Sequence, residues 1–418
     1  MFKINPDKQL SIKQNMLYNS IGNFIYGISQ WLLVVIVTRL KGYEDAGVLS
    51  LAIAVVAVLY TISLYGMRVF QATDVLYSYS DGDYITSRII TVIISLPLCV
   101  AFIFINGYSN NKAAVIGAFM LYRCIEACSD VFHGILQRKK RMDYIGISVT
   151  IRAILILIAF VGTLSAGGSL WLACLSMAVA SVIVLLFFDI PSTKHICKTT
   201  PTFSVKKQKS LLWTCFPLMS AALVYNAVLA TPRYYLERIV SDEILGVFSA
   251  LYVPTLFITS MATYLLSPIA VEFGECVKNN DYKKFMKLFY TSSALIMGVS
   301  IIASGGAYIL GDFALKIFYG KDMSNYIIQF VALTFISGLY ALIFLMGNIF
   351  TVLRWLYFML ITHIIVFVIS IAITPQIISS FELWGAVFVT GFIAIIYLII
   401  NIGGIIYLNR KSKNEKLN

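Results

Sequence analysis

The chain alternates between long apolar stretches and short polar breaks, and this alternation predicts its architecture. Each apolar stretch is close to the length, about 20 residues, that an α-helix needs to cross the hydrocarbon core of a bilayer. The sequence contains twelve of them, at residues 17–38, 46–66, 86–106, 113–136, 144–164, 169–188, 210–231, 246–267, 288–310, 326–349, 355–374 and 384–408. No polar break is long enough for a soluble domain. We therefore expect an all-α, polytopic membrane protein with twelve transmembrane helices.

The longest hydrophilic break divides the twelve spans into two sets of six. It covers residues 189–209, is rich in Lys, Thr, Ser and Pro, and falls between the sixth and seventh apolar stretches. We interpret it as a cytoplasmic linker. The N-terminal six-helix bundle is then predicted at residues 1–188 and the C-terminal one at residues 210–418.

A short repeated phrase supports this division. Arg39, Glu44, Gly47, Val48 and Ser50 recur with the same spacing as Arg238, Glu243, Gly246, Val247 and Ser249. The first copy follows the first apolar stretch and the second follows the seventh, as expected for two copies of a six-span unit. We interpret the phrase as the place where the first helix of each half turns back into the next, with Gly47 and Gly246 allowing a tight turn.

Composition and charge predict how the chain lies in the membrane. Apolar residues make up 59% of the chain and charged residues 12%, against about half and about a quarter in an ordinary soluble domain. With a cytoplasmic N-terminus, the inner segments carry 23 Lys and Arg and the outer segments 7, which predicts that both termini are cytoplasmic. The net charge of +12 then reflects loop asymmetry and not a nucleic-acid partner. The seven cysteines have no disulfide or zinc spacing, and no cofactor or metal is predicted.

A line of polar residues runs along the fourth apolar stretch. Arg123, Glu126, Asp130, His133 and Gln137 fall within one arc of a helix. A charge facing lipid at the helix centre costs about 2.5–3.5 kcal/mol, so this line must face protein or water. One interpretation is a structural ion pair between Arg123 and Glu126. The other is the lining of an aqueous cavity, where Arg123 attracts an anionic head group and Glu126 or Asp130 carries a coupling proton.

Further polar residues are candidates for the same cavity or for the membrane interface. Four side chains of the first span lie along one narrow arc: Asn19, Asn23, Tyr26 and Gln30. They suit hydroxyl-rich ligands, and hydrogen bonding between helices is an equal alternative. Arg152 in the fifth span has no carboxylate within a turn of its own helix, so it needs a partner from another span, a cavity or an anionic ligand. Arginines near span ends are expected to anchor helices at the interface: Arg39, Arg68, Arg233 and Arg238.

Several segments together resemble the polysaccharide transporter family, and most closely its Wzx-type O-antigen flippases. The segments are Thr38-Arg39-Leu40 through Gly47, Leu49-Ser50-Leu51, Tyr65-Gly66-Met67-Arg68 leading to Asp74, Leu136-Gln137, Arg141-Met142-Asp143-Tyr144-Ile145-Gly146 and Pro232-Arg233-Tyr234-Tyr235-Leu236-Glu237. With the twelve-span layout, the resemblance covers nearly the whole chain. Two features depart from relatives in the same superfamily. The chain lacks the additional spans usual in lipid II flippases, and its first span lacks the carboxylate of many bacterial drug exporters.

The resemblance implies a fold and a substrate. The fold is that of multidrug and toxic-compound exporters (MATE-like), two six-helix bundles related by a pseudo-twofold axis with a cavity between them. The substrate is an undecaprenyl-diphosphate-linked oligosaccharide, moved from the inner to the outer leaflet of the bacterial cytoplasmic membrane by alternating access. A polysaccharide polymerase and a chain-length regulator are the implied protein partners. Arginines in the lumen would bind the diphosphate or acidic sugars through paired donors.

Two other functions stay open at this point. A cation-coupled antiporter of drugs or small molecules is compatible with the charged fourth span. A membrane enzyme, such as a polysaccharide polymerase or an acyltransferase, usually carries catalytic residues on a sizeable external loop, whereas every predicted outer loop is about 15 residues or shorter. The sequence also has no Walker A, Gly-x-Ser-x-Gly or His-Glu-x-x-His motif. We therefore expect a transporter and not an enzyme.

Overall fold

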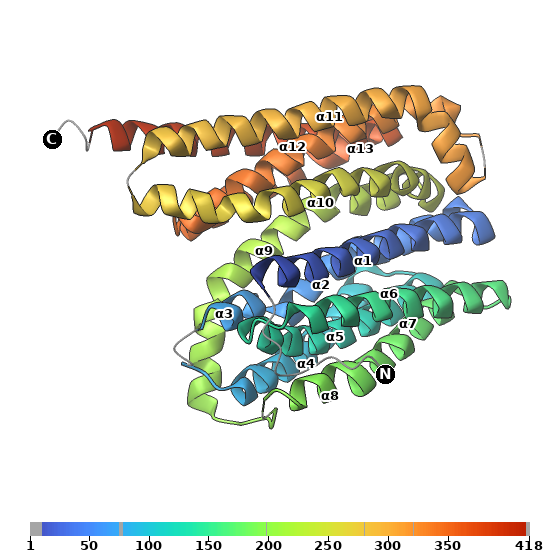
Figure 1. Ribbon diagram of the computed structural model, residues 1–418. Coiled ribbons are helices and arrows are strands. Elements are labelled where there is room, and N and C mark those ends of the chain that lie inside the picture. Colours follow the sequence, from blue (N-terminus) through green and yellow to red (C-terminus); the bar gives the residue numbers. More distant parts are fainter. Residues whose placement is uncertain (1–10, 75–77, 198, 280, 321, 415–418) are drawn as a thin grey trace. The chain divides into compact units, whose positions relative to one another are not determined.

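The protein folds into long helices joined by short turns. The computed structural model describes residues 11–74, 78–197, 199–279, 281–320 and 322–414, and these residues contain no strand (Figure 1). The helices up to the predicted linker are α1 (Ile12–Lys41), α2 (Tyr43–Leu64), α3 (Met67–Thr73), α4 (Asp81–Asn106), α5 (Asn110–Arg138), α6 (Met142–Ser165), α7 (Leu170–Val184), the π-helical turn η1 (Leu185–Asp189) and α8 (Ile190–Lys194). The remaining helices are α9 (Val205–Ile239), α10 (Asp242–Lys278), α11 (Tyr282–Tyr319), the short η2 (Ser324–Tyr326), α12 (Ile327–Val352) and α13 (Leu356–Asn414).

Each of the twelve predicted spans falls on one of these helices, to within a few residues at its ends. Among the described residues, nine helical segments are long and apolar enough to cross a membrane. Helix α5, which carries the fourth predicted span, is not among the nine, because Arg123, Glu126 and Asp130 interrupt its apolar run. The eleventh and twelfth predicted spans both belong to α13. They meet at a kink at Glu382 (φ 46°, ψ −118°) with no loop between them.

The chain forms two compact units, Met1–Asn226 and Ala227–Asn418. Their boundary falls inside α9 and not in the polar break at residues 189–209. That break contains the last residue of η1, all of α8 and the start of α9. Its role as a linker between two functional halves stays a prediction.

The repeated phrase lies at corresponding corners of the chain, between α1 and α2 and between α9 and α10. In the first copy a single residue, Gly42, separates the two helices. Its φ of 97° is accessible to glycine and strained for other residues. Gly47 is buried inside α2, and Gly246 lies inside α10. The predicted role of Gly47 and Gly246 in the turn is therefore wrong, because the reversal takes place before either residue.

Helices α1 and α6 lie side by side in the N-terminal unit, with their backbones in contact (Figure 1). A Cβ atom on Gly22 of α1 would lie 2.5 Å from the carbonyl oxygen of Gly146 in α6, and one on Gly146 would lie closer still to the carbonyl oxygen of Tyr18. Only glycine permits so close an approach. The contact holds together the two helices that carry Tyr26 and Arg152.

Gly146→Ala is therefore expected to destabilise the protein by about 1–3 kcal/mol, the usual cost of overpacking a well-packed contact. The change should appear as a lower melting temperature of the purified protein in detergent. Gly162→Ala is the matched control on the same helix, because a Cβ atom there meets nothing within 4 Å. Equal melting temperatures for the two variants would contradict the close α1–α6 contact.

The segment that leads into α9 is fastened to the start of α4. Thr202 donates from its hydroxyl to Asp83 Oδ1 (2.8 Å), and Gln208 of α9 donates to the carbonyl oxygen of Asp83 (3.1 Å). Further along α9, Leu211 and Cys215 pack into a buried cluster with residues of α3, α4 and α5. The first half of α9 is thus held on the N-terminal unit, with its Gln208–Leu211–Cys215 face turned inward.

Candidate functional site

A polar pocket of about 170 Å³ lies among five helices of the N-terminal unit. The residues that line it are Asn23 and Tyr26 of α1, Tyr60 of α2, Arg68 of α3, Arg123, Glu126, Asp130 and His133 of α5, and Val149 and Arg152 of α6. Six of the eight lumen residues predicted from the sequence meet at this pocket. The other two, Asn19 and Gln30, are not among its lining residues. We refer to it as the charged pocket.

Arg123 and Glu126 form the ion pair that their spacing predicts. Arg123 Nη1 lies 2.5 Å from Glu126 Oε2 and donates to the hydroxyl oxygen of Tyr26 at 2.8 Å. The hydroxyls of Tyr26 and Tyr122 both donate to Glu126 Oε1, at 2.6 and 3.0 Å. The Arg123 guanidinium also lies over the ring of Tyr60, 4.3 Å from its centroid. Because 22% of the Arg123 side chain is still exposed, part of it stays accessible from the pocket.

Asp130 lies between two arginines. Its Oδ1 is 3.1 Å from Arg68 Nη1, and its Oδ2 is 2.8 Å from Arg88 Nη2. Arg68 also donates from Nε to the side-chain oxygen of Gln137 (3.1 Å). The structure therefore places Arg68 against the polar line of α5, as a pocket residue and not as the predicted interfacial anchor.

Arg88 pairs with Asp130 and was not predicted from the sequence as a residue of the site. It is 1% exposed and also donates to the carbonyl oxygen of Ser63 (2.6 Å). In the sequence it lies close to the start of the third apolar stretch and resembles a loop-side charge. Its position two residues inside that stretch is the only signal that it belongs to the interior.

Arg152 of α6 forms an ion pair with Asp189, a residue of the π-helical turn η1. Asp189 closes the π-helical turn η1, and its Oδ2 is 2.6 Å from Arg152 Nη2. Ser148 donates to Asp189 Oδ1 (2.5 Å), and His133 Nε2 lies 3.4 Å from the same oxygen. All four side chains are buried. Asp189 is the first residue of the predicted linker, so its position in the sequence predicts that it lies outside the membrane. Asp189 could have been recognised as a candidate from its sequence position, because it is an acidic residue directly after an apolar stretch and Arg152 needs an acidic partner from another span.

The polar line of α1 is shared between the charged pocket and contacts among helices. Asn23 and Tyr26 line the pocket. Asn23 donates to the side-chain oxygen of Asn19 at 3.1 Å and to its carbonyl oxygen at 2.8 Å. Gln30 donates to the hydroxyl oxygen of Tyr122 at 3.4 Å. Two of the four side chains thus line the pocket, and two of them, Tyr26 and Gln30, make hydrogen bonds between helices.

The remaining predicted anchors are not among the residues that line the charged pocket. Arg39 is exposed in the last turn of α1. In the C-terminal unit, the Arg233 guanidinium lies over the ring of Tyr252 at 4.8 Å. Arg238 lies over Tyr234 at 5.7 Å. Arg39 and Arg238 lie in the last turns of their helices, whereas Arg233 lies six residues before the end of α9. For all three, interfacial anchoring stays a prediction.

Asp74, the last residue of the Tyr65–Asp74 segment, organises the turn between α3 and α4. It accepts hydrogen bonds from the backbone N–H groups of Ser78 and Tyr79 (2.9 and 3.2 Å) and from the hydroxyl of Tyr84 (3.1 Å). Burial opposes ionisation of Asp74, but these hydrogen bonds outweigh it and hold the pKa of its carboxyl below the ordinary value. The residue has a structural role at this turn.

The charged pocket and the groups bonded to it carry an excess of positive charge. They comprise four arginines and three carboxylates: Arg68, Arg88, Arg123 and Arg152, with Glu126, Asp130 and Asp189. Among these seven groups, one positive charge is left over. An excess charge within low-dielectric walls attracts an ion of opposite sign. Because guanidinium matches phosphate and carboxylate oxygens through paired donors, the arrangement is suited to an anion.

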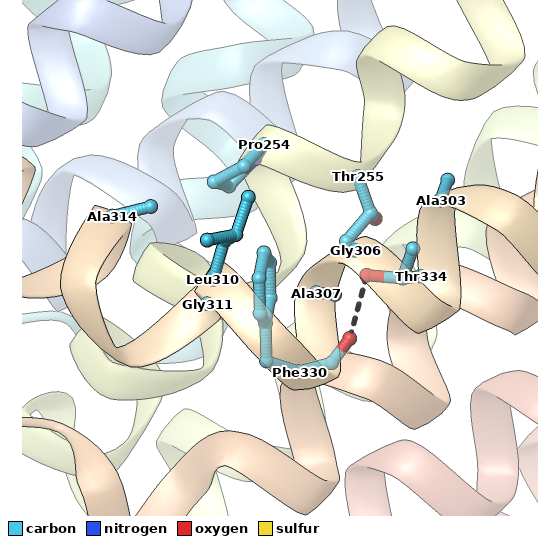
Figure 2. Close-up of a pocket in the computed structure, with 10 residues that line it drawn as sticks. All are labelled: Pro254, Thr255, Ala303, Gly306, Ala307, Leu310, Gly311, Ala314, Phe330 and Thr334. Atoms are coloured by element: carbon cyan, nitrogen blue, oxygen red, sulfur yellow. Dashed lines mark hydrogen bonds between the residues drawn. The ribbon is translucent and has the colours of Figure 1, made fainter.

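The C-terminal unit has a pocket of a different kind. Its volume is about 270 Å³, and its lining comes from Pro254 and Thr255 of α10, Ala303, Gly306, Ala307, Leu310, Gly311 and Ala314 of α11, and Phe330 and Thr334 of α12. Figure 2 shows that the lining is apolar apart from the two threonines. The hydroxyl of Thr334 donates to the carbonyl oxygen of Phe330 (2.7 Å, Figure 2). The hydroxyl of Thr255 donates to the backbone carbonyl oxygen of Tyr252 (2.7 Å). This pocket offers no charge to a ligand, in contrast to the charged pocket.

Comparison with known proteins connects this architecture to a family. The family described as "Polysaccharide biosynthesis protein" matches residues 12–272, which is more than half of the chain. The chain belongs to this family. The resemblance inferred from the sequence segments is thereby confirmed.

Relatives of this polysaccharide biosynthesis protein agree with that assignment. The capsular polysaccharide biosynthesis protein CapF of Staphylococcus aureus is 24% identical over 344 residues, which cover 81% of this chain and 83% of CapF. Among solved structures, the MATE multidrug transporter DinF-BH matches with a TM-score of 0.70 at 13% identity, over 96% of this chain and 95% of that one. An inward-facing MATE family transporter of the MOP superfamily matches with a TM-score of 0.67 at 13% identity, over 98% and 96%. The predicted MATE-like, multi-pass membrane fold is confirmed.

Proposed function

We propose that this polysaccharide biosynthesis protein is a flippase for lipid-linked oligosaccharides. It moves an undecaprenyl-diphosphate-linked repeat unit from the inner to the outer leaflet of the bacterial cytoplasmic membrane by alternating access. The family, the capsular role named for CapF and the transporter fold support this proposal. The repeat unit belongs to a surface polysaccharide, for which the sequence resemblance favours an O-antigen and the likeness to CapF favours a capsule.

The observation that carries the proposal is the partly exposed Arg123 side chain in a pocket with excess positive charge. A diphosphate is the part of the substrate that such a group binds best. Asn23 and Tyr26 line the same pocket and offer amide and phenol groups to sugar hydroxyls. At about 170 Å³, the pocket is smaller than the roughly 300–1,000 Å³ of typical ligand sites. In this conformation it suits the phosphate end of the substrate and not a whole oligosaccharide.

We further propose that Glu126 carries the coupling proton. Protonation of Asp130 would leave two guanidinium groups, Arg68 and Arg88, without their counter-charge. Protonation of Glu126 affects one guanidinium, and its two phenol partners can reorient around a neutral acid. Glu126→Gln should therefore make transport in proteoliposomes independent of an imposed pH gradient. Transport that still follows the gradient in this variant would exclude Glu126 as the carrier.

The proposal also includes an orientation and partners. Loop charge favours a cytoplasmic location for both termini, and in this proposal the flipped unit passes to a polysaccharide polymerase and a chain-length regulator. Cys197 follows α8 in the predicted cytoplasmic segment and is half-buried. A membrane-impermeant thiol reagent should therefore label Cys197 in inside-out vesicles and leave it unlabelled in intact cells. The opposite pattern would reverse the orientation.

Deletion of the gene is the decisive experiment. We expect loss of the surface polysaccharide and accumulation of lipid-linked repeat units on the cytoplasmic face of the membrane, both reversed by the intact gene. Intact surface polysaccharide, with no accumulated lipid-linked units, would overturn the proposal.

A cation-coupled multidrug or small-molecule antiporter is the second candidate. The likeness to a MATE multidrug transporter and the carboxylates in the charged pocket favour it. Efflux of a drug cation from proteoliposomes, driven by an imposed pH gradient and abolished in Glu126→Gln, would support this function. A membrane polysaccharide polymerase or acyltransferase has no comparable observation in its favour.

A further inference from the structure

The N-terminal unit contains a second, larger cavity where the first half of α9 meets the turn between α2 and α3. Its volume is about 450 Å³, within the range of ligand-binding sites. The lining residues that matter here are Tyr65, Phe203, Val205, Lys209, Trp213 and Phe216. We refer to this cavity as the α9 groove. It shares no lining residue with the charged pocket.

One face of α9 forms a wall of the groove. Val205, Lys209, Trp213 and Phe216 follow one another at intervals of four, four and three residues, so they form a single stripe along the helix. Trp213 is 77% exposed, and its ring stacks on that of Phe216 with centroids 5.9 Å apart. The inward face of the same helix is made by Gln208, Leu211 and Cys215, and of these three only Gln208 also lines the groove. The aromatic stripe is thus not required for packing within this unit.

In the described part of the chain, the one charged side chain that lines the groove is the exposed Lys209, which lies between Val205 and Trp213 in this stripe. Lys206 and Lys207 fall in the same first turns of α9, where Lys207 Nζ lies 3.5 Å from Asp83 Oδ2. The start of a long helix adds a partial positive charge. From Lys209 towards the middle of α9 the lining is aromatic and aliphatic, with Leu212, Trp213 and Phe216. With the orientation predicted from loop charge, the lysines lie at the level of the cytoplasmic head groups and the aromatic rings lie deeper in the membrane. A phosphate with a hydrocarbon chain matches this order.

The groove shares a structural element with the charged pocket. Tyr65 lines the groove, and Arg68, three residues further on, lines the pocket. Between them the chain makes a sharp turn with both Tyr65 (φ 51°) and Gly66 (φ 65°) in the left-handed region, which is strained for a tyrosine. A Cβ atom on Gly66 would touch the side chain of Leu218 in α9 at 3.0 Å. A ligand in the groove therefore contacts the turn that positions an arginine of the pocket.

We propose that the α9 groove binds the polyprenyl phosphate end of the substrate lipid before its head group enters the charged pocket. The phosphate lies at Lys209, and the isoprenoid chain lies along Trp213 and Phe216. A polyprenyl lipid has one chain and a phospholipid has two, and the single row of Lys209, Trp213 and Phe216 along α9 offers a path for one chain. This inference rests on the proposed flippase function, which supplies the class of lipid.

The test measures retention of undecaprenyl phosphate by the full-length protein in detergent, by native mass spectrometry. Lys209→Glu should lower the affinity about tenfold or more, the effect of losing one charge-assisted hydrogen bond. Trp213→Ala should also weaken retention, and its melting temperature should stay unchanged because the side chain is mostly exposed. Lys283→Glu and Tyr290→Ala are the matched controls. They remove an exposed lysine and an exposed aromatic residue near the start of another long helix, α11, and should leave retention unchanged.

Two competition arms identify the ligand. Undecaprenol, which lacks the phosphate, and phosphatidylglycerol, which has two chains, should each displace undecaprenyl phosphate poorly at equal mole fraction. Displacement by phosphatidylglycerol as effective as by undecaprenyl phosphate itself would assign the groove to bulk anionic lipid and overturn the proposal. Equal losses in the groove variants and the α11 controls would overturn it as well.

A third arm separates the groove from the pocket and from the function. Arg123→Ala should retain undecaprenyl phosphate in the groove, and a loss equal to that of Lys209→Glu would place the phosphate in the pocket instead. If the deletion strain accumulates lipid-linked units but the protein retains no undecaprenyl phosphate, the groove proposal fails and the flippase proposal stands. If the protein retains undecaprenyl phosphate in the groove but deletion of its gene has no effect on the polysaccharide, the flippase proposal fails and lipid binding in the groove stands.

Discussion

Arg123→Ala is expected to abolish export of the polysaccharide while the protein still inserts and folds. The side chain is one of the two partly exposed arginines that line the charged pocket, with Arg68, and its loss also removes the partner of Glu126 Oε2. A hydrogen bond to a charged group contributes about 1.5–3 kcal/mol, so loss of a paired contact to a phosphate should weaken binding about a hundredfold or more. Surface polysaccharide in a complemented deletion strain measures the effect. The amount of protein in the membrane serves as the folding control.

Arg123→Lys is the sharper variant, because it keeps the charge and loses the planar fork. Partial export is expected, between that of the wild type and that of Arg123→Ala. The double variant Arg123→Ala/Glu126→Ala distinguishes the two interpretations of the polar line. If the pair were only structural, removal of both charges would restore export. Normal export in Arg123→Ala or in the double variant would therefore refute binding by Arg123.

Asp189→Asn is expected to give the largest loss of stability. The carboxylate is buried against Arg152, which is 4% exposed, so the variant leaves a buried guanidinium without its counter-charge. Removal of one partner from a buried ion pair costs about 3–5 kcal/mol. The melting temperature of the purified protein in detergent should fall accordingly.

Two further variants make this prediction specific. Arg152→Met/Asp189→Leu removes both charges and should recover much of the lost stability, because apolar replacements of buried pairs are often neutral. Glu44→Gln alters an exposed acid at the start of α2 and should change stability by no more than about 0.5 kcal/mol. An Asp189→Asn protein as stable as Glu44→Gln would show that Arg152 does not depend on Asp189.

The spans and the polar line of α5 could be predicted because both are local properties of the chain. Apolar length marks a span, and helical spacing alone puts Arg123, Glu126 and Asp130 on one face. Which side chains of neighbouring helices contact that face depends on how those helices are rotated and on their depth in the membrane. The spacing of residues within α5 does not contain this information. Arg88 and Asp189 were therefore not recognisable as its partners.

Turn geometry explains the remaining differences between sequence and structure. Arg68 has the sequence position of a span-end anchor, but the left-handed pair Tyr65–Gly66 turns the chain so that α3 carries it to the pocket. A repeated motif indicates equivalent places in two halves and does not identify the residue that bends. Gly42 makes the turn in the first copy although it is not part of the repeat, and Gly47 is part of the repeat but lies inside a helix.

The order of the buried ion pairs along the chain has a consequence for biogenesis. Each carboxylate of the network is synthesised after an arginine that it contacts: Glu126 after Arg123, Asp130 after Arg68 and Arg88, and Asp189 after Arg152. During co-translational insertion, no acid of the network therefore reaches the bilayer before a cation that can neutralise it. Arg152 is the last arginine to be paired, when the end of the sixth span emerges from the ribosome. A nascent chain that stops before Asp189 would lack the carboxylate that pairs with Arg152 in the folded protein.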